Sequence, residues 1–216
     1  MTASRSPSAR TPRRSRNRRG EGGQLRDDIL AAAAELLLEL QDEDKVTIRA
    51  VASAAGVSAP SVYLHFPDKD ALIFAVCQEL FAALDAHIEA AVDAVDDPFE
   101  AMRRRALGYT HFGIEHPEQY RVLFMPRPSS VPDTFDSGEL LTSAAFAHLY
   151  ENVGAMLATG TLQDGLDSYS LALELWAVVH GHTALRIGHP GFDWPPVDEM
   201  VSLACAHLFD GLRRRD

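Results

Sequence analysis

Apolar residues recur at steps of three and four along most of the chain, which is the spacing of one face of an α-helix. The first such stretch begins at Leu25 and carries Ile29, Ala33 and Leu37 on one face, and the stretch from Gln41 to Asp44, which holds three acidic residues, ends it. A longer stretch from Asp68 to Val95 repeats the pattern, and it stops before an Asp-Asp-Pro sequence. The spacing therefore predicts two long helices in the N-terminal half.

Further helices are predicted after Pro98, separated by residues that begin or end helices. Their expected ranges are about 99–115, 117–125, 138–158, 167–187 and 196–214, with a Pro/Ser loop over 126–136. Alternation of apolar and polar residues never persists, so no strand is expected. The predicted fold class is all-α.

The stretch from Thr47 to Phe66 predicts two short helices joined by a tight turn. Thr47 is placed to cap the first helix and Ser58 to cap the second, while Pro60 falls in the first turn of the second helix. Gly56 between them suits a left-handed turn that other residues enter only at a steric cost. A helix-turn-helix of this kind places its second helix in the major groove of DNA, although a plain corner inside a helical bundle gives the same pattern.

The residues after the second helix distinguish these two alternatives. Tyr63, Phe66, Lys69 and Leu72 stand at the spacing Tyr-x-x-Phe-x-x-Lys-x-x-Leu. Together with the helix around Ile29, this stretch resembles the TetR/AcrR family of bacterial transcriptional regulators over about residues 25–80. The resemblance implies a three-helix DNA-binding domain over residues 24–70, followed by a helical ligand-binding and dimerisation domain over 71–216.

The resemblance also implies roles for individual residues of the DNA-binding domain. Side chains expected to contact phosphates, which fix register without reading sequence, are Thr47, Arg49, Tyr63, His65 and Lys69. Side chains expected at base edges, at the start of the recognition helix, are Ser58, Ala59 and Ser61. Because these three are small and weakly polar, shape readout could supply much of the specificity.

The C-terminal half contains Trp176, His180 and Gly181 in one apolar helix, which resembles the Trp-His-Gly type of TetR C-terminal domain. The expected ligand-binding residues are Tyr109, Phe112, Tyr120, Phe124, Met125, Trp176 and His180. Aromatic and Met side chains suit an adaptable apolar pocket, but each could equally be packed core.

Gly181 within a helix predicts a close approach by another helix. The last two helices are expected to form the dimer interface, with a stripe of Leu203, Ala204, His207, Leu208 and Leu212.

The charge distribution supports a DNA-binding end and an acidic body. The formal net charge is −11, yet residues 1–75 hold 11 basic and 10 acidic side chains, against 9 and 21 in residues 76–216. Residues 1–23 lack periodicity and are rich in Arg, Ser, Pro and Gly, so they are predicted to be a disordered arm. The arm either contacts DNA or remains a solvated tail.

The remaining function classes are less consistent with the sequence. No catalytic motif is present, and His180, His182 and His189 do not share one helix face, so neither an enzyme nor a metal site or cofactor is expected. Cys77 and Cys205 both fall in apolar stretches, where thiols are usually inert. We expect a cytoplasmic homodimeric repressor whose partners are double-stranded operator DNA and an unidentified small molecule, with no membrane association. The alternative is a DNA-binding regulator without a ligand, controlled by a partner or by thiol redox.

Overall fold

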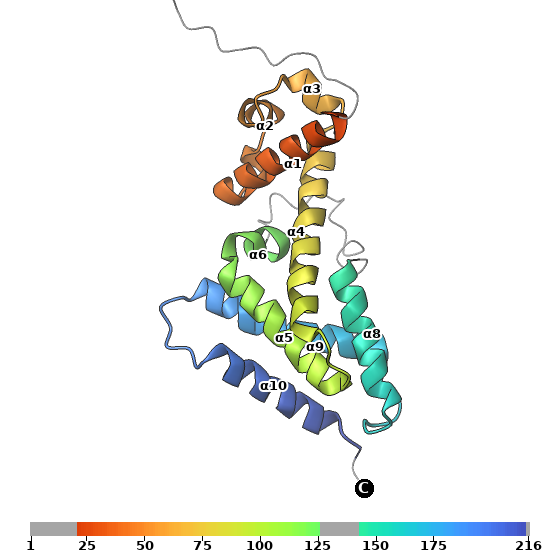
Figure 1. The fold of residues 1–216 in the computed structure, drawn as a ribbon. Helices are drawn as coiled ribbons and strands as arrows, with labels where there is room; N and C mark the ends of the chain where they lie inside the picture. Colours follow the sequence, from red (N-terminus) through yellow and green to blue (C-terminus); the bar gives the residue numbers. More distant parts are fainter. Residues whose placement is uncertain (1–20, 126–142, 215–216) are drawn as a thin grey trace, which may run out of the picture.

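The computed structural model describes residues 21–125 and 143–214, and these residues fold into nine α-helices and one short 3-10 helix (Figure 1). Their bounds are α1 Glu21–Leu40, η1 Glu43–Lys45, α2 Ile48–Ala54, α3 Ala59–Tyr63, α4 Lys69–Val92, α5 Pro98–Glu115, α6 Pro117–Phe124, α8 Ala144–Ala158, α9 Ser168–Gly188 and α10 Val197–Leu212. Across the described ranges, the one extended pairing is an isolated bridge between Leu162 and Arg213. The predicted all-α class is confirmed.

The predicted helix ranges agree with the structure apart from their ends. Helix α1 begins at Glu21, so residues 21–23 form its first turn and the prediction that the arm extends to residue 23 is wrong there. Helix α4 ends at Val92, because Asp93 leaves helical geometry and Ala94 adopts a positive φ of 59°. The Pro/Ser loop predicted over 126–136, residues 138–142 of the next predicted helix and the arm before Glu21 lie outside the described residues.

The N-terminal domain packs α1, α2 and α3 around the first turns of α4. Its core contains Ile29, Val51, Val62, Phe66 and Leu72, each less than 4% exposed. The guanidinium of Arg26 lies 5.1 Å from the centre of the Phe66 ring and covers its outer face. Helix α3 lies on the surface of this domain, at the opposite end of the molecule from α10 (Figure 1).

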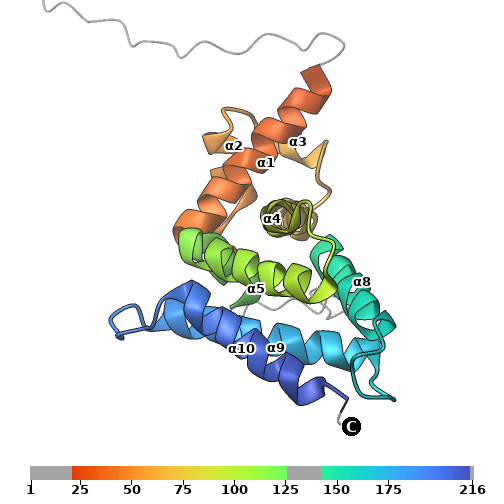
Figure 2. The same ribbon diagram turned by 60° about the horizontal axis from the view of Figure 1, so that its bottom comes forward.

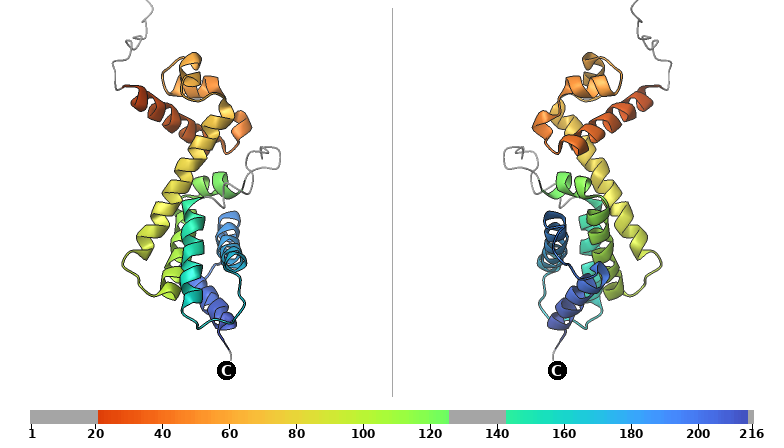
Figure 3. Two further views of the ribbon diagram at one scale, coloured as in Figure 1. Left: turned by 90° about the vertical axis from the view of Figure 1, so that its right-hand side faces the viewer. Right: turned by 90° about the vertical axis from the view of Figure 1, so that its left-hand side faces the viewer.

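Helix α4 runs from this domain into the C-terminal bundle, as the side views in Figure 3 show. Its buried residues continue along its length from Leu72 to Ile88, so one helix contributes to the packing of both domains. By length and composition α4 could cross a membrane, with a mean hydropathy of 1.6, but 44% of the apolar window is buried inside the protein. Its apolar character is therefore explained by its position in the core.

The C-terminal bundle is built around α5, which packs against α4, α8, α9 and α10 (Figure 2). Two glycines of α5 allow close approach. A Cβ at Gly108 would lie 3.2 Å from the Ile88 Cα on α4, and a Cβ at Gly113 would collide with Thr183 on α9. At Gly181 nothing within the described chain lies within 4 Å of an added Cβ. Among the described helices, the close approach predicted at Gly181 is therefore absent, and close approaches are found at Gly108 and Gly113 instead.

Candidate DNA-reading surface and ligand cavity

The turn of the predicted helix-turn-helix has the geometry that its sequence predicts. The Thr47 hydroxyl accepts a hydrogen bond from the Ala50 N–H at 3.2 Å and caps α2. Gly56 adopts the left-handed conformation with a φ of 68°. Ser58 occupies the cap position of α3, but its hydroxyl lies 2.8 Å from the Ser61 hydroxyl and makes no bond to the helix backbone. The predicted capping bond of Ser58 is therefore wrong.

The surface around α3 is partly polar and partly apolar. Thr47, Arg49 and Ser58 are exposed, whereas Ser61 and His65 are half-buried. Tyr63 is 53% exposed and Leu64 is 83% exposed, which is unusual for side chains with so much apolar area. Val62 faces inward and is fully buried.

Lys69 and Ala59 are less available than the other predicted DNA contacts. The Lys69 ammonium donates to the Glu43 carbonyl at 3.1 Å and lies 4.0 Å from an Asp44 carboxylate oxygen. It therefore holds the 3-10 turn against the start of α4 while keeping two further N–H donors. Burial raises the pKa of Glu43, an effect that Lys69 opposes. Ala59 packs against the core of the domain.

A cavity lies within the C-terminal bundle among α4, α5, α8, α9 and α10. Its walls are almost entirely apolar, with Arg105, Ser143 and His182 among the few polar exceptions. The apolar lining comes mainly from Phe81, Leu84, Ile88, Met102, Ala106, Tyr109, Phe124, Ala145, Phe146, Leu149, Leu175, Trp176, Val178, Val179, Val201, Ala204 and Leu208. Such a lining suits a small molecule that is largely apolar and has few hydrogen-bonding groups.

A chain of buried hydrogen bonds adjoins one wall of the cavity. The Trp176 Nε1–H donates to the Tyr109 hydroxyl at 3.4 Å, and the Tyr109 hydroxyl donates to the Tyr120 hydroxyl at 3.2 Å. Tyr120 Oη lies 2.8 Å from His180 Nδ1. Burial lowers the pKa of His180, so near neutral pH its neutral ring accepts a hydrogen bond from the Tyr120 hydroxyl at Nδ1. The chain therefore pairs the hydroxyls of the buried Tyr109 and Tyr120 with two half-buried groups, the Trp176 Nε1–H and the His180 ring.

The same burial keeps both tyrosines protonated. It raises the pKa of Tyr120 to about 12 and that of Tyr109 well above its usual value, with the neighbouring tyrosine adding to the shift of Tyr109. The two hydroxyls therefore act as neutral donors across the physiological range of pH. Their rings also contact each other edge to face, with centres 5.7 Å apart.

Comparison with known proteins agrees with this two-part architecture. Residues 29–76 match the family of bacterial regulatory proteins of the tetR type, and residues 102–208 match the tetracyclin repressor-like C-terminal domain. These two matches together cover the helix-turn-helix and most of the C-terminal bundle. The chain belongs to the TetR family of transcriptional regulators.

Individual proteins are similar to this TetR-family regulator in sequence or in structure. It is 33% identical over 114 residues to the HTH-type transcriptional regulator EthR of Mycolicibacterium smegmatis, a match that covers 52% of each chain, about half the length of that relative. A protein of unknown function from Rhodococcus sp. RHA1 has a similar structure, with a TM-score of 0.72 and 29% identity over 88% of this chain and 96% of that one. A putative TetR-family regulator from Vibrio parahaemolyticus shares the fold, with a TM-score of 0.66 and 21% identity over 88% and 99% of the two chains.

Of the seven ligand-binding residues predicted for this TetR-family regulator, three line the cavity and four do not. Tyr109, Phe124 and Trp176 line the cavity. Tyr120 and His180 lie behind Tyr109 in the hydrogen-bonded chain, and Phe112 and Met125 pack elsewhere in the core. Phe112 is 2% exposed and contacts the His87 and His116 rings, and it lies farther along α5, toward the C-terminal end of the helix, than the α5 residues that line the cavity.

Sequence reasoning missed several residues of both surfaces. Leu64 follows directly after Tyr63. Its exposure could not be predicted, because an apolar residue in a helical pattern is expected to be buried. The cavity residues of α8, including Ala145 and Leu149, carry no distinguishing chemistry and are identified only by the fold. Arg105 is charged, but only the fold shows that it lies in the cavity wall.

Proposed function

We propose that this TetR-family regulator is a homodimeric repressor that a small, largely apolar ligand releases from its operator. The observation that carries the proposal is the double role of α4. Leu72 and Val76 belong to the same core cluster as the helix-turn-helix, whereas Phe81, Leu84 and Ile88 line the cavity. A molecule that reshapes the cavity therefore acts directly on the helix that supports the DNA-binding domain.

On the DNA side, two copies of α3 would enter successive major grooves about 34–36 Å apart. We assign Thr47, Arg49, Tyr63, His65 and Lys69 to phosphates. The base edges are assigned to Ser58, Ala59 and Ser61. Tyr63 and Arg49 are supported best, because both side chains are exposed beside α3. Lys69 would reach a phosphate only with the donors that Glu43 does not occupy.

On the dimer side, α9 and α10 would pair with their copies around a two-fold axis. Leu185 on α9 is 50% exposed and Leu203 on α10 is 53% exposed, so apolar area on both helices is left uncovered by residues 21–125 and 143–214. Gly181 adds a position on α9 where another helix could approach closely. The predicted α10 stripe divides, because Ala204 and Leu208 line the cavity while Leu203 and His207 face solvent.

Release requires the ligand to bind the DNA-free arrangement more tightly than the DNA-bound one.

Control by thiol redox, the alternative mechanism, is supported less well. Cys77 and Cys205 are both buried, and burial raises the pKa of Cys205 to about 11, so its reactive thiolate is scarce at neutral pH.

The DNA assignment is tested by gel shift on DNA from around the protein's own gene. Tyr63→Ala and Arg49→Ala should each weaken binding, because each removes a contact to the backbone of the duplex. Tyr150→Ala is the matched control, since Tyr150 is similarly exposed at 46% but lies on α8 in the C-terminal bundle. Equal affinities of the Tyr63 and Tyr150 variants would exclude the assigned surface.

The ligand assignment is tested through Trp176, which lines the cavity and is one of only two tryptophans. In a Trp194→Phe background, the apolar dye anilinonaphthalene sulfonate should quench Trp176 saturably. Ala145→Phe on α8 should weaken this binding, because Ala145 lines the cavity, whereas Ala147→Phe on the exposed face of α8 should not. Indistinguishable dye affinities of the two variants would show that this cavity is not the binding site, leaving control by a partner as the better proposal.

A further inference from the structure

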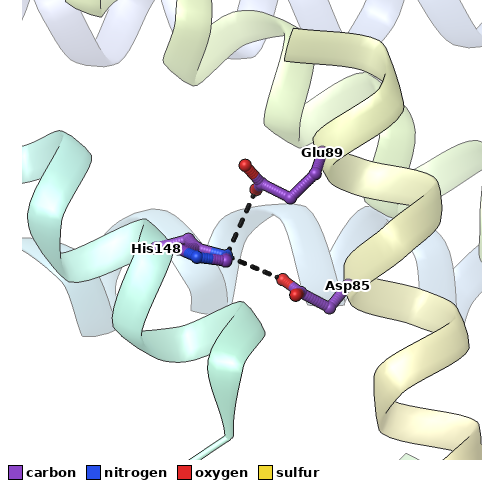
Figure 4. Close-up of side chains that lie close together, drawn as sticks. All are labelled: Asp85, Glu89 and His148. Atoms are coloured by element: carbon purple, nitrogen blue, oxygen red, sulfur yellow. Dashed lines mark hydrogen bonds and ion pairs between the residues drawn. The ribbon is translucent and has the colours of Figure 1, made fainter. Parts of the chain in front are cut away.

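Three side chains from α4 and α8 converge at the edge of the C-terminal bundle (Figure 4). Asp85 and Glu89 are one turn apart on α4, and His148 faces them from α8. The His148 Nδ1 atom lies 2.9 Å from an Asp85 carboxylate oxygen and 3.4 Å from a Glu89 carboxylate oxygen. All three atoms lie within 4.8 Å of one another.

A ring nitrogen placed against two carboxylate oxygens requires either a bonded hydrogen or a cation among them. With a lone pair on Nδ1, three electron-rich atoms would face one another at short range, so either a proton or a metal cation must lie between them. Ligands held about 2.0–2.2 Å from a shared metal ion are themselves about 3–4 Å apart. The observed separations of Nδ1 from the two oxygens fall in or close to that range.

Neighbouring residues hold one of the three side chains, Glu89, in place. The Arg105 guanidinium binds both oxygens of Glu89, and its Nε–H donates to the Asn152 side-chain oxygen at 3.1 Å. Asn152 in turn donates to the Pro98 carbonyl at 2.9 Å. Ligands fixed by hydrogen bonds of this kind are typical of metal sites, where the outer contacts orient the inner ones. Arg105 also brings the formal charge of the two carboxylates and itself to −1, which favours one further cation.

We propose that Asp85, Glu89 and His148 bind a divalent first-row transition-metal cation that bridges α4 and α8. One nitrogen and two carboxylate oxygens suit Zn²⁺ or Mn²⁺, with water completing the coordination. The metal takes the place of the hydrogen on Nδ1, and the neutral ring that binds it carries its hydrogen on Nε2. This inference does not depend on the proposed repressor function, because it concerns binding to the protein without DNA.

The site also contacts the cavity through one residue. Arg105 binds Glu89 on one side and lines the cavity with another part of its side chain. A cation at Glu89 would share that carboxylate with Arg105. The proposed metal site is therefore next to the cavity, but it is built from charged side chains whereas the cavity lining is apolar.

The test is a titration of the full-length, tag-free protein with ZnCl₂ and, separately, MnCl₂ after removal of metal by a chelator. Calorimetry should show one saturable site per chain, and the metal should raise the melting temperature of the wild-type protein. His148→Ala and Asp85→Asn should each weaken binding by about 10- to 100-fold or more. Co²⁺ should give d–d absorption bands with the wild-type protein that the His148 variant lacks.

The matched control is His111→Ala. His111 Nε2 lies 2.8 Å from an Asp198 oxygen, so it has one carboxylate partner where His148 has two. This variant should bind both metals as the wild type does. The proposal is overturned if the wild-type protein shows no saturable binding of either cation, or if the His148 and His111 variants lose affinity equally. The wild-type titration remains decisive even if a variant fails to fold.

Discussion

The close approach of α5 to α9 at Gly113 predicts that Gly113→Ala destabilises the protein. Gly113 is buried, and an added methyl group would collide with the Thr183 Cγ2 atom on α9 and lie 2.9 Å from the Tyr120 Cδ2 atom on α6. Alanine favours a helix over glycine by about 1 kcal/mol. Overpacking a close-packed core costs about 1–3 kcal/mol, occasionally more. Because two contacts of the added Cβ are shorter than 3.0 Å, the steric cost falls in the upper part of that range, about 2–3 kcal/mol, and we expect a net loss of about 1–2 kcal/mol.

Thermal unfolding followed by circular dichroism measures this loss. In a chain of this size, 1 kcal/mol corresponds to about 2–4 °C, so Gly113→Ala should lower the melting temperature by about 2–8 °C. Gly154→Ala is the matched control, because Gly154 lies exposed within α8 with open space around it and should gain about 1 kcal/mol. A Gly113 variant as stable as the Gly154 variant would refute the packing argument.

Three further outcomes follow from single residues. A Cβ added at Gly181 meets nothing within the described chain, so Gly181→Ala should stabilise the isolated chain. If α9 forms the dimer interface, the same variant should weaken association in sedimentation experiments. An unchanged dimer would count against that interface. Burial lowers the pKa of His180 below 6.5, so the unfolded chain takes up a proton first and stability falls as the pH drops below about 6.5. His180→Gln should make this decline shallower in denaturant titrations between about pH 6.5 and 5, and an unaltered slope would remove His180 as a cause. Thr47→Ala should cost about 1 kcal/mol through loss of the α2 cap, whereas Thr47→Ser should retain both stability and operator affinity in unfolding and gel-shift assays.

The helix-turn-helix was predictable because its determinants are local. Thr47, Gly56 and Val62 act within one or two turns of their own positions, and each adopts in the structure the place that its chemistry requires. The exception is Ser58, whose hydroxyl bonds to the neighbouring Ser61 hydroxyl, an equally local alternative that the sequence does not distinguish from a cap.

The C-terminal bundle was harder to predict because its helices are apolar on more than one face. Phe112 and Tyr109 lie three positions apart on α5, yet only Tyr109 faces the cavity. Gly113 and Gly181 are both helical glycines, and only the fold reveals which one a neighbouring helix approaches. In the group of Asp85, Glu89 and His148, the two carboxylates are one helical turn apart but His148 is distant in sequence, so no spacing rule could bring the three together.

The continuity of α4 converts small changes of angle into base-pair-sized displacements. Its 24 residues extend for about 36 Å, because each helical residue adds about 1.5 Å. A tilt of only about 5° around its lower end would carry the upper end by about 3 Å, close to the rise of one base pair of DNA. In a dimer the two displacements would add, so the spacing of the recognition helices could be lost while each subunit kept its core packing almost intact.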